Sequence, residues 1–343
     1  MTAADPAMLA IDAHGGDHGV VVTVPAAVAA LRTDTRLQAV LVGREPEIRQ
    51  ALASCRQAPS DRIQIRHAED ILPMDAGPAT ALRRGRKSSM WLALQMVADG
   101  SAGACVSGGG TGALMALGVK QVGLLPGLQR PALMAWVPLP HCRTAMLDLG
   151  ANLHVSARQL VQFAVMGAVT AETADRVENP RVGLLNVGHE DGKGHEAVRE
   201  AHAALKELRL NYVGFVEGHD IYSGNVDVAV CDGFSGNLIL KASEGLARML
   251  VNEFRNALSS SLASRLGALL AGPAIRRALA PLDPAEHNGA PLLGLKRVVV
   301  KSHGGADCRA MTRAILEAGR EARRGVPDRI EASMQAFQLE TEA

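Results

Sequence analysis

The sequence of 343 residues lacks any long apolar run, because no stretch approaches the roughly 18 uncharged apolar residues of a membrane-spanning helix. Its N-terminal segment, Met1 to Met8, has neither the basic start nor the apolar centre of a secretion signal. We therefore expect a chain that is neither exported nor membrane-spanning.

Cysteine patterning and net charge are lacking as well. The five cysteines are odd in number and form no C-x-x-C pair, which argues against a disulfide framework or a zinc knuckle and fits a reducing cytoplasm. Lys and Arg total 36 against 35 for Asp and Glu, a net charge of +1. Because no overall field attracts nucleic acid or an anionic membrane, we expect no nucleic-acid partner, and any bound anion must be held by a local site.

What the sequence does contain, six times, is a short apolar run that ends at a polar residue and then breaks into glycine. Such a run is typical of a strand buried on both faces. Ligands of open α/β sheets collect beyond the carboxyl ends of these strands, so we expect the polar residues to face one shared crevice. The runs are Leu9 to Asp12, Ala104 to Ser107, Ala145 to Asp148, Val182 to Asn186, Val226 to Asp232 and Val298 to Lys301.

Segments with helical spacing of apolar residues separate these runs. The alternation predicts one α/β unit over residues 1–343, with three α/β/α layers and a mostly parallel sheet. The predicted helices are Ser88 to Ala98, Gly112 to Val122, Ala157 to Ala174, His195 to Leu208, Gly236 to Leu258 and Cys308 to Arg323.

One region, residues 244–285, departs from the alternation and predicts a projecting helical hairpin, interrupted at Gly272-Pro273. One interpretation packs the hairpin against a second subunit. The other rests its apolar tip on a membrane surface, as amphipathic interfacial helices do, and both can hold together. Because aromatic anchors are absent from the tip, we expect weak and reversible membrane contact. The tip carries Leu262, Leu266, Leu269, Leu270, Ile275 and Leu279 beside Arg265, Arg276 and Arg277.

Two glycine-rich loops suggest anion binding. Gly108 to Gly112 follows a strand and opens a helix at Thr111, which offers backbone N–H groups and a helix N-terminus to phosphate. No acidic residue closes a strand about 20 residues later, which argues against a nicotinamide cofactor. Gly188 to Gly194 is one residue too short for an ATP-binding Walker loop, and no Ser or Thr follows Lys193. We therefore expect no cofactor.

Other reactive side chains have simpler interpretations. The segment Asp12 to His18 holds ligand types for zinc or manganese, but we favour Asp12 and Asp17 as helix caps that brace a glycine turn, and no metal. Cys105 and Cys231 lie inside strand signals and are expected to be buried rather than nucleophilic.

The segment Asp232 to Asn237 combines a carboxylate, a hydroxyl and an amide before the helix that carries Lys241. It is either part of the site or a helix cap made by Asp232 or Ser235. Lys193 and Lys301 flank other glycine loops, with site and solvated surface equally open.

Ordered segments along nearly the whole chain match those of one known family. They are Ile11 to Asp17, Ser88 to Met90, Val106 to Ala113, Arg130 to Ala132, Leu147 to Asn152, Gln162 to Ala164, Arg181 to Gly188, Lys193-Gly194, Val216 to Gly218, Val230 to Lys241, Gly289 to Gly294 and His303-Gly304. The chain thereby resembles the PlsX-type phosphate acyltransferases of bacterial lipid synthesis.

The resemblance implies transfer of a fatty acyl group from acyl carrier protein to inorganic phosphate. The acyl phosphate product would serve a glycerol-3-phosphate acyltransferase in phospholipid synthesis. It also implies a fold like that of isopropylmalate dehydrogenases and phosphate acetyltransferases, a homodimer, and loose attachment to the inner face of the cytoplasmic membrane. The alternatives are an isopropylmalate-dehydrogenase-like oxidoreductase and a non-catalytic membrane scaffold for lipid enzymes.

The chain departs from the family at several loop positions. The family usually has Met at His14, Asn at Gly110, Asn at His195 and Arg at His219, and two serines at Gly305-Ala306. Losing the amide at Gly110 and the cation at His219 removes polar contacts to phosphate. We hypothesise that His14 and His219 partly substitute for them.

A phosphate dianion is already nucleophilic, and a thiolate, whose parent pKa is about 8.5, leaves easily, so positioning and charge neutralisation must dominate catalysis. We expect Lys193 or Lys301 to hold phosphate with the glycine-loop amides. Asn186, Asn237 or backbone N–H groups would stabilise the oxyanion, and His303 would protonate the thiol. The catalytic set is Lys193, Asp232, Asn237 and His303, and the substrate-binding set is Asp12, Gly16, Ser107, Gly109, Gly110, Thr111, Asn152, Asn186 and Lys301.

The two parts of the acyl donor are expected to contact different regions. The acyl chain is expected in an apolar groove near the hairpin. The acidic carrier would dock on the basic cluster of Arg83, Arg84, Arg86 and Lys87, which is otherwise a solvated helix end.

Overall fold

The computed structural model describes residues 7–175, 177–279 and 283–342. Within them a single 11-stranded sheet has the order β3-β2-β1-β4-β11-β10-β5-β6-β9-β7-β8. The strands are β1 (Ala7–Asp12), β2 (Leu37–Gly43), β3 (Ile63–His67), β4 (Ala104–Ser107), β5 (Ala132–Pro138), β6 (Arg143–Leu147), β7 (Val182–Leu185), β8 (Tyr212–Val216), β9 (Val228–Val230), β10 (Ala290–Leu293) and β11 (Val298–Lys301).

Helices cover both faces of this sheet, and they confirm the predicted helical segments to within a few residues. They are α1 (Val20–Thr33), α2 (Glu45–Ala53), α3 (Pro78–Arg84), α4 (Ser89–Ala98), α5 (Thr111–Gln121), α6 (Ala157–Asp175), α7 (Glu196–Lys206), α8 (Gly233–Ser259), α9 (Leu262–Leu279), α10 (Cys308–Arg324) and α11 (Val326–Glu342), with short 3-10 turns η1 (Ser60–Arg62), η2 (Asp220–Tyr222) and η4 (Pro284–His287).

The three layers follow from alternation along the strands. Successive strand residues point to opposite faces. Leu9 and Ile11 of β1 pack into a core with α1 and α10, whereas Ala10 packs into a second core with α4 and α5. At the other half of the sheet, Leu147 and Val230 pack on α6. The structure therefore confirms the predicted α/β/α fold.

Strand direction divides the sheet into two halves. β1, β2, β3, β4 and β11 run parallel to one another, and so do β6, β7, β8 and β9. Between them, β10 is antiparallel to both β11 and β5, and β5 is antiparallel to β6. The two parallel groups therefore run in opposite directions. The polar strand endings form two clusters, and the register across β10 and β5 sets Leu147, at the end of β6, level with Val300 of β11. Both clusters therefore lie near the middle of the sheet, and a single shared crevice stays a prediction.

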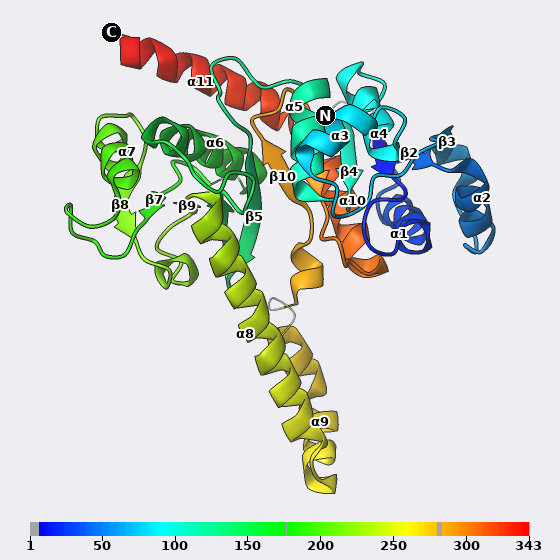
Figure 1. Ribbon diagram of the computed structural model, residues 1–343. Coiled ribbons are helices and arrows are strands. Elements are labelled where there is room, and N and C mark those ends of the chain that lie inside the picture. The colour runs from blue at the N-terminus through cyan, green and yellow to red at the C-terminus, as the bar shows by residue number, and fades with distance from the viewer. Residues whose placement is uncertain (1–6, 176, 280–282, 343) are drawn as a thin grey trace.

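Helices α8 and α9 form the hairpin, which projects away from the sheet (Figure 1). Helix α9 runs through Pro273, so the interruption predicted at Gly272-Pro273 is absent. Among the described residues, no helix is both long and apolar enough to cross a bilayer. Residues 280–282 of the predicted hairpin lie outside the described residues, as do the side chains of Leu262, Leu266, Arg276, Arg277 and Leu279.

Candidate active site

The carboxyl ends of β1, β4 and β11 bring together a glycine-loop cluster, which we define as Asp12, Ser107, Gly108 to Thr111, Lys301 and His303. Asp12 is 2% exposed, and its Oδ2 accepts a hydrogen bond of 2.6 Å from Ser107 Oγ. Ser107 Oγ in turn accepts from the N–H of Gly109 at 3.0 Å. Burial raises the pKa of Asp12 against the hydrogen bonds from Ser107 and Ser89. These contacts set the shape of the glycine loop.

Close backbone approaches explain two of the glycines. Gly16 has a φ of +96°, and a Cβ there would lie 2.9 Å from the carbonyl oxygen of Gly304. A Cβ at Gly110 would lie only 2.6 Å from the carbonyl oxygen of Met74. The asparagine usual at Gly110 in the family does not fit this backbone, because the segment at Met74 passes over the loop.

Helix α5 starts from this loop with its N-terminus uncapped. Its N-cap residue is Gly110, and within the described chain no side chain accepts a hydrogen bond from the first turn. The N–H groups of a first helical turn lack intrahelical acceptors and carry the positive end of the helix dipole. Gly109, Gly110 and Thr111 therefore lie where the sequence predicts anion binding.

Lys301 adds a buried cation at the same place. It is 8% exposed, and its Nζ donates to the carbonyl oxygens of Gly108, at 3.3 Å, and Ser302. Burial lowers its pKa to about 8, and the charge of Lys241 on α8 lowers it further, while Asp17 and Asp12 act in the opposite direction. A buried ammonium group held by carbonyls is costly unless an anion pairs with it.

His303 lies beside Lys301 and is exposed. Its Nδ1 accepts from the N–H of Gly305 at 3.1 Å, so the neutral ring carries its proton on Nε2. Partial burial of the ring and the charge of Lys241 lower the pKa of His303. The neutral form of His303 is therefore favoured, and its Nε2–H can donate a hydrogen bond. Protonation of the thiol by His303 stays a prediction.

The second cluster, at the carboxyl ends of β6 and β9, is the asparagine cluster: Asp148, Asn152, Asp232 and Asn237. Buried Asp148 accepts from the N–H groups of Leu133 and Ala151 at 3.0 Å, and from both the N–H (2.7 Å) and Nδ2 (2.8 Å) of Asn152. Burial raises the pKa of Asp148 against these bonds. The side chain of Asn152 is engaged in holding Asp148, so its predicted substrate contact has no support here.

Asp232 begins α8. Its carboxylate accepts from the N–H and the Oγ of Ser235, at 2.8 and 2.9 Å, which confirms the capping interpretation for Asp232. Asn237 is exposed one turn further along and lies against Gly150. Among the described residues, the Asn237 side chain makes no hydrogen bond, whereas the amide of Asn152 makes two.

Asn186 and Lys193 lie at the edge of this second cluster, on the loop that follows β7. Asn186 Nδ2 donates to the carbonyl oxygen of Lys193 at 3.2 Å, so this amide stabilises the loop. The side chain of Lys193 is exposed. Because Lys301 is paired with Ser107 of β4 and its Nζ donates to the Gly108 carbonyl oxygen, Lys301 rather than Lys193 accompanies the glycine loop.

Helix α8 connects the two clusters. It begins at Gly233 in the asparagine cluster, and Lys241, about 12 Å along its axis, affects the pKa of both Lys301 and His303. The sequence named Lys241 without assigning it a role. It also did not single out Ser89 as a partner of Asp12, although Ser88 to Met90 belong to the matched family segments.

The observed hydrogen bonds disagree with several predictions made from the sequence. His14 Nε2 accepts from the N–H of Arg44 at 3.0 Å, and His219 lies 3.5 Å from both Glu217 and Asp220. Neither histidine replaces a missing contact in the glycine loop. The N-cap of α1 is Gly19, so Asp12 and Asp17 do not cap it.

Cysteine and metal chemistry receive no support. Burial raises the pKa of Cys105 and Cys231 well above the usual value, and Asp12 and Asp148, respectively, raise it further, as expected for buried side chains that are not nucleophiles. In the described part of the chain, no three His, Cys, Asp or Glu side chains are grouped as metal ligands.

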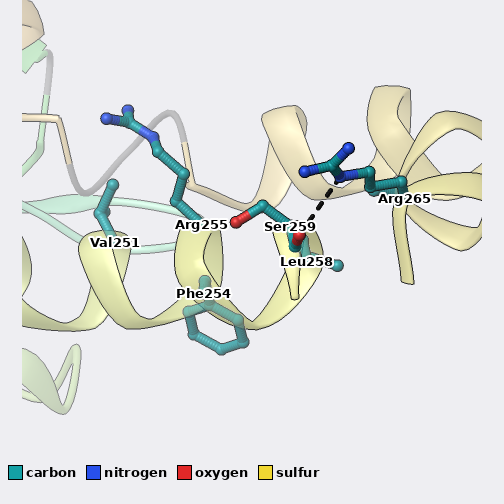
Figure 2. A pocket seen from close by; sticks show the side chains of 7 residues that line it. Val251, Phe254, Arg255, Leu258, Ser259 and Arg265 are labelled. Atoms are coloured by element: carbon teal, nitrogen blue, oxygen red, sulfur yellow. Dashed lines mark hydrogen bonds between the residues drawn. The ribbon is translucent and has the colours of Figure 1, made fainter. Parts of the chain in front are cut away.

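An open groove of about 330 Å³ lies on the hairpin, away from both clusters. Figure 2 shows its lining side chains, with Arg265 Nε donating to the Ser259 carbonyl oxygen at 3.2 Å. The groove is lined mainly by apolar atoms of Val251, Phe254, Arg255, Leu258, Ser259, Arg265 and Ala268.

Known proteins support the same fold and define the family. A phosphotransacetylase from Streptococcus pyogenes superposes with a TM-score of 0.62 at 18% identity, covering 92% of this chain and 94% of that one. A phosphotransacetylase from Staphylococcus aureus gives 0.57 at 14% identity, covering 93% and 96%. The fold is thus shared with phosphate-dependent acyltransferases.

Sequence similarity is much stronger. The family model described as "Fatty acid synthesis protein" matches residues 7–329. The phosphate acyltransferase of Hydrogenovibrio crunogenus is 46% identical over 334 residues, covering 97% of this chain and 98% of the relative. That of Halorhodospira halophila is 47% identical over 328 residues, covering 95% and 96%. The molecule is an acyltransferase. It belongs to the fatty acid synthesis family of phosphate acyltransferases, the PlsX-type family that its sequence resembles.

Proposed function

We propose that this enzyme transfers a fatty acyl group from acyl carrier protein to inorganic phosphate, releasing acyl phosphate and the free carrier. One observation supports this most strongly: the buried ammonium group of Lys301 lies beside the uncapped N-terminus of α5. A buried cation and a helix N-terminus together favour a small anion.

The reaction follows from this placement. Phosphate, held by the amides of Gly110 and Thr111 and by Lys301, attacks the thioester carbonyl with one of its oxygens. Asn237, on α8 one turn before Lys241, donates to the oxyanion, a contact whose loss costs about 3 kcal/mol. The C–S bond then breaks, and the proton that phosphate brought ends on the thiol. Lys301, with a pKa of about 8, is proposed to relay this proton.

The acyl donor is proposed to meet the enzyme through basic groups. Arg83 and Arg84 at the end of α3 and Arg86 just beyond it are exposed, and Lys87 pairs with Glu69 at 2.8 Å. This basic patch suits an acidic carrier protein. Lys193, exposed near the asparagine cluster, contacts the same acidic donor rather than phosphate.

The hairpin is proposed to mediate assembly and membrane contact. Exposed apolar side chains follow one ridge of α8 at spacings of four or eight residues: Phe234, Leu238, Leu246, Leu250 and Phe254. A second copy of the chain covers this ridge to form a homodimer.

Leu269 and Leu270 of α9 are more than 75% exposed and allow weak, reversible contact with the inner face of the cytoplasmic membrane. The groove of Figure 2 is proposed to hold the distal part of the acyl chain. Acyl phosphate released there serves a glycerol-3-phosphate acyltransferase.

The test is direct. The protein is incubated with acyl carrier thioester and labelled phosphate, and acyl phosphate is trapped with hydroxylamine. The proposal predicts a phosphate-dependent acyl hydroxamate. No product in the presence of active partner enzymes would favour a scaffold instead, and reduction of a nicotinamide by a hydroxy acid would favour a dehydrogenase.

A further inference from the structure

A chain of hydrogen bonds outside both clusters joins β8, α7 and the loop that carries Lys193. Tyr212 Oη lies 2.6 Å from His202 Nδ1, and His202 Nε2 lies 3.1 Å from Asp191 Oδ1. The imidazole of His202 is stacked on Phe215 with ring centroids 4.0 Å apart, and the residue is 7% exposed. The position of the ring is therefore fixed by packing on one side and by hydrogen bonds at both nitrogens.

The protons in this chain can be assigned. Burial, with the nearby charge of Asp191, raises the pKa of Tyr212, so the phenol keeps its proton and donates it to His202 Nδ1. The neutral ring then carries hydrogen on Nε2, which donates to Asp191. This donor has its acceptor only while the loop is folded back, because Asp191 belongs to the loop and His202 to α7.

One face of α7 holds the loop at several points. Arg199, His202 and Lys206 lie three and four residues apart and so share a face. Arg199 donates to the carbonyl oxygen of Gly194, and Lys206 Nζ lies 3.4 Å from Asp191 Oδ1. Lys193 lies between these two anchors, and its own carbonyl oxygen is held by Asn186.

The sheet register shows where the anchored loop lies. Leu184 of β7 is paired with Val230 of β9, so the loop after β7 leaves the sheet beside Asp232 and the start of α8. The loop therefore borders the asparagine cluster.

We propose that His202 is a positioning residue. Through Asp191 it holds the 186–195 loop closed, so that Lys193 stays beside the carboxyl ends of β7 and β9 and meets the acidic acyl donor. The inference rests on the proposed function, in which Lys193 contacts the donor and Lys301 the phosphate. An open loop leaves the buried Nε2–H of His202 without its acceptor, which disfavours opening.

Limited trypsin digestion tests the loop directly, because Lys193 is itself a cleavage site inside it. His202→Phe keeps a flat ring against Phe215 but loses both hydrogen bonds. Cleavage after Lys193, followed by mass spectrometry, is expected to become about tenfold faster. Cleavage after Arg56, an exposed site in the other half, is expected to stay unchanged and so controls for general unfolding.

Further variants separate anchoring from simple loss of structure. Asp191→Leu is expected to behave like His202→Phe, whereas Asp191→Asn keeps an acceptor oxygen and rescues most of the protection. Asn211→Ala is the matched control, because it removes a 2.8 Å hydrogen bond to the Asn179 carbonyl oxygen just before β8, away from the loop. It is expected to leave cleavage after Lys193 at the wild-type rate.

Steady-state kinetics with the full-length enzyme complete the test. His202→Phe is expected to raise KM for the acyl carrier donor several-fold while KM for phosphate and kcat stay near wild type. Unchanged cleavage after Lys193 would overturn the inference. Faster cleavage with an unchanged donor KM would also overturn it, since the loop would then have no part in catalysis. Failure of the proposed function itself is recognised separately, by a Lys301 variant that still binds phosphate normally.

Discussion

The glycine-loop cluster and the asparagine cluster both lie beyond the carboxyl ends of parallel strands, but they use their polar groups differently. In the asparagine cluster, Asp148 is surrounded by donors and Asp232 caps its own helix. In the glycine-loop cluster, α5 has no side-chain cap and Asp12 Oδ1 has no hydrogen-bond partner among the described residues. Similar strand endings thus produce one structural brace and one site with binding capacity left for a ligand.

The largest expected effect comes from the cation of the glycine-loop cluster. Lys301→Met is expected to weaken phosphate binding about 100-fold, because the charge partner of the anion is lost. Calorimetric titration with phosphate measures this. Wild-type affinity in Lys301→Met would remove the distinction between the clusters.

The same variant, Lys301→Met, is expected to stabilise the fold although it weakens phosphate binding. The folded pKa of Lys301, about 8, lies below the ordinary 10.5, so below pH 8 the buried ammonium destabilises the fold, and this cost fades between pH 8 and 10.5. Without phosphate at pH 7, Lys301→Met is expected to gain up to about 3 kcal/mol. Urea unfolding at pH 7 and pH 10 measures the gain, which should shrink at the higher pH. A variant less stable than wild type at pH 7 would contradict this account.

The next effect concerns the shape of the glycine loop. Gly110→Asn introduces the residue usual in the family, yet its Cβ would meet the Met74 carbonyl oxygen at 2.6 Å. We expect a loss of about 1–3 kcal/mol in unfolding free energy and weaker phosphate binding. Gly77→Ala, where a Cβ meets nothing within 4 Å, is the control. Improved phosphate binding in Gly110→Asn would show that the loop tolerates the family residue.

A smaller effect is expected in the asparagine cluster. Asp232→Ala removes the cap of α8 and is expected to cost about 1 kcal/mol of stability, while the phosphate dissociation constant stays unchanged. Thermal unfolding and phosphate titration measure the two quantities on one sample. A large loss of phosphate affinity would assign Asp232 to the binding site.

The smallest expected effect concerns Glu321, a buried carboxyl group, and tests whether burial shifts its pKa as it shifts the pKa of Lys301. Burial and the neighbouring charge of Glu317 raise the pKa of Glu321 from 4.5 to about 7. Wild-type stability therefore falls as pH rises from 4.5 through 7. Glu321→Gln is expected to be more stable at pH 8 by less than about 1 kcal/mol, because the ion pair with Arg324 is also lost, with phosphate binding unchanged. Equal melting temperatures at pH 8 would contradict the raised pKa.

Apolar periodicity predicted the strands that end in glycine and the helices between them, because burial on both faces leaves a visible pattern. It could not predict strand direction. The reversal depends on β10 and β5. The short apolar sequences of these two strands would show the same pattern in a parallel and in an antiparallel strand. The sequence therefore did not show that Asp148 and Asp232 follow strands opposite in direction to the strand that carries Asp12.

The sequence predicted which residues gather at the candidate site better than it predicted what each of them does there. The sequence named Asp12, Ser107 and Lys301, and the structure places all three together. It also named Asn152 and Asn186, whose amides are engaged in hydrogen bonds with their own loops. Whether a polar group is satisfied depends on partners from distant segments, such as Pro131 for Asn152, and these appear only after folding.

Titration of inorganic phosphate into the wild type, Lys301→Met and Lys193→Ala by isothermal calorimetry tests the central claim most directly. The account predicts binding to the wild type and to Lys193→Ala with similar affinity, and binding weakened about 100-fold in Lys301→Met. Loss of phosphate binding in Lys193→Ala with retention in Lys301→Met would contradict it and place phosphate at the loop that follows β7.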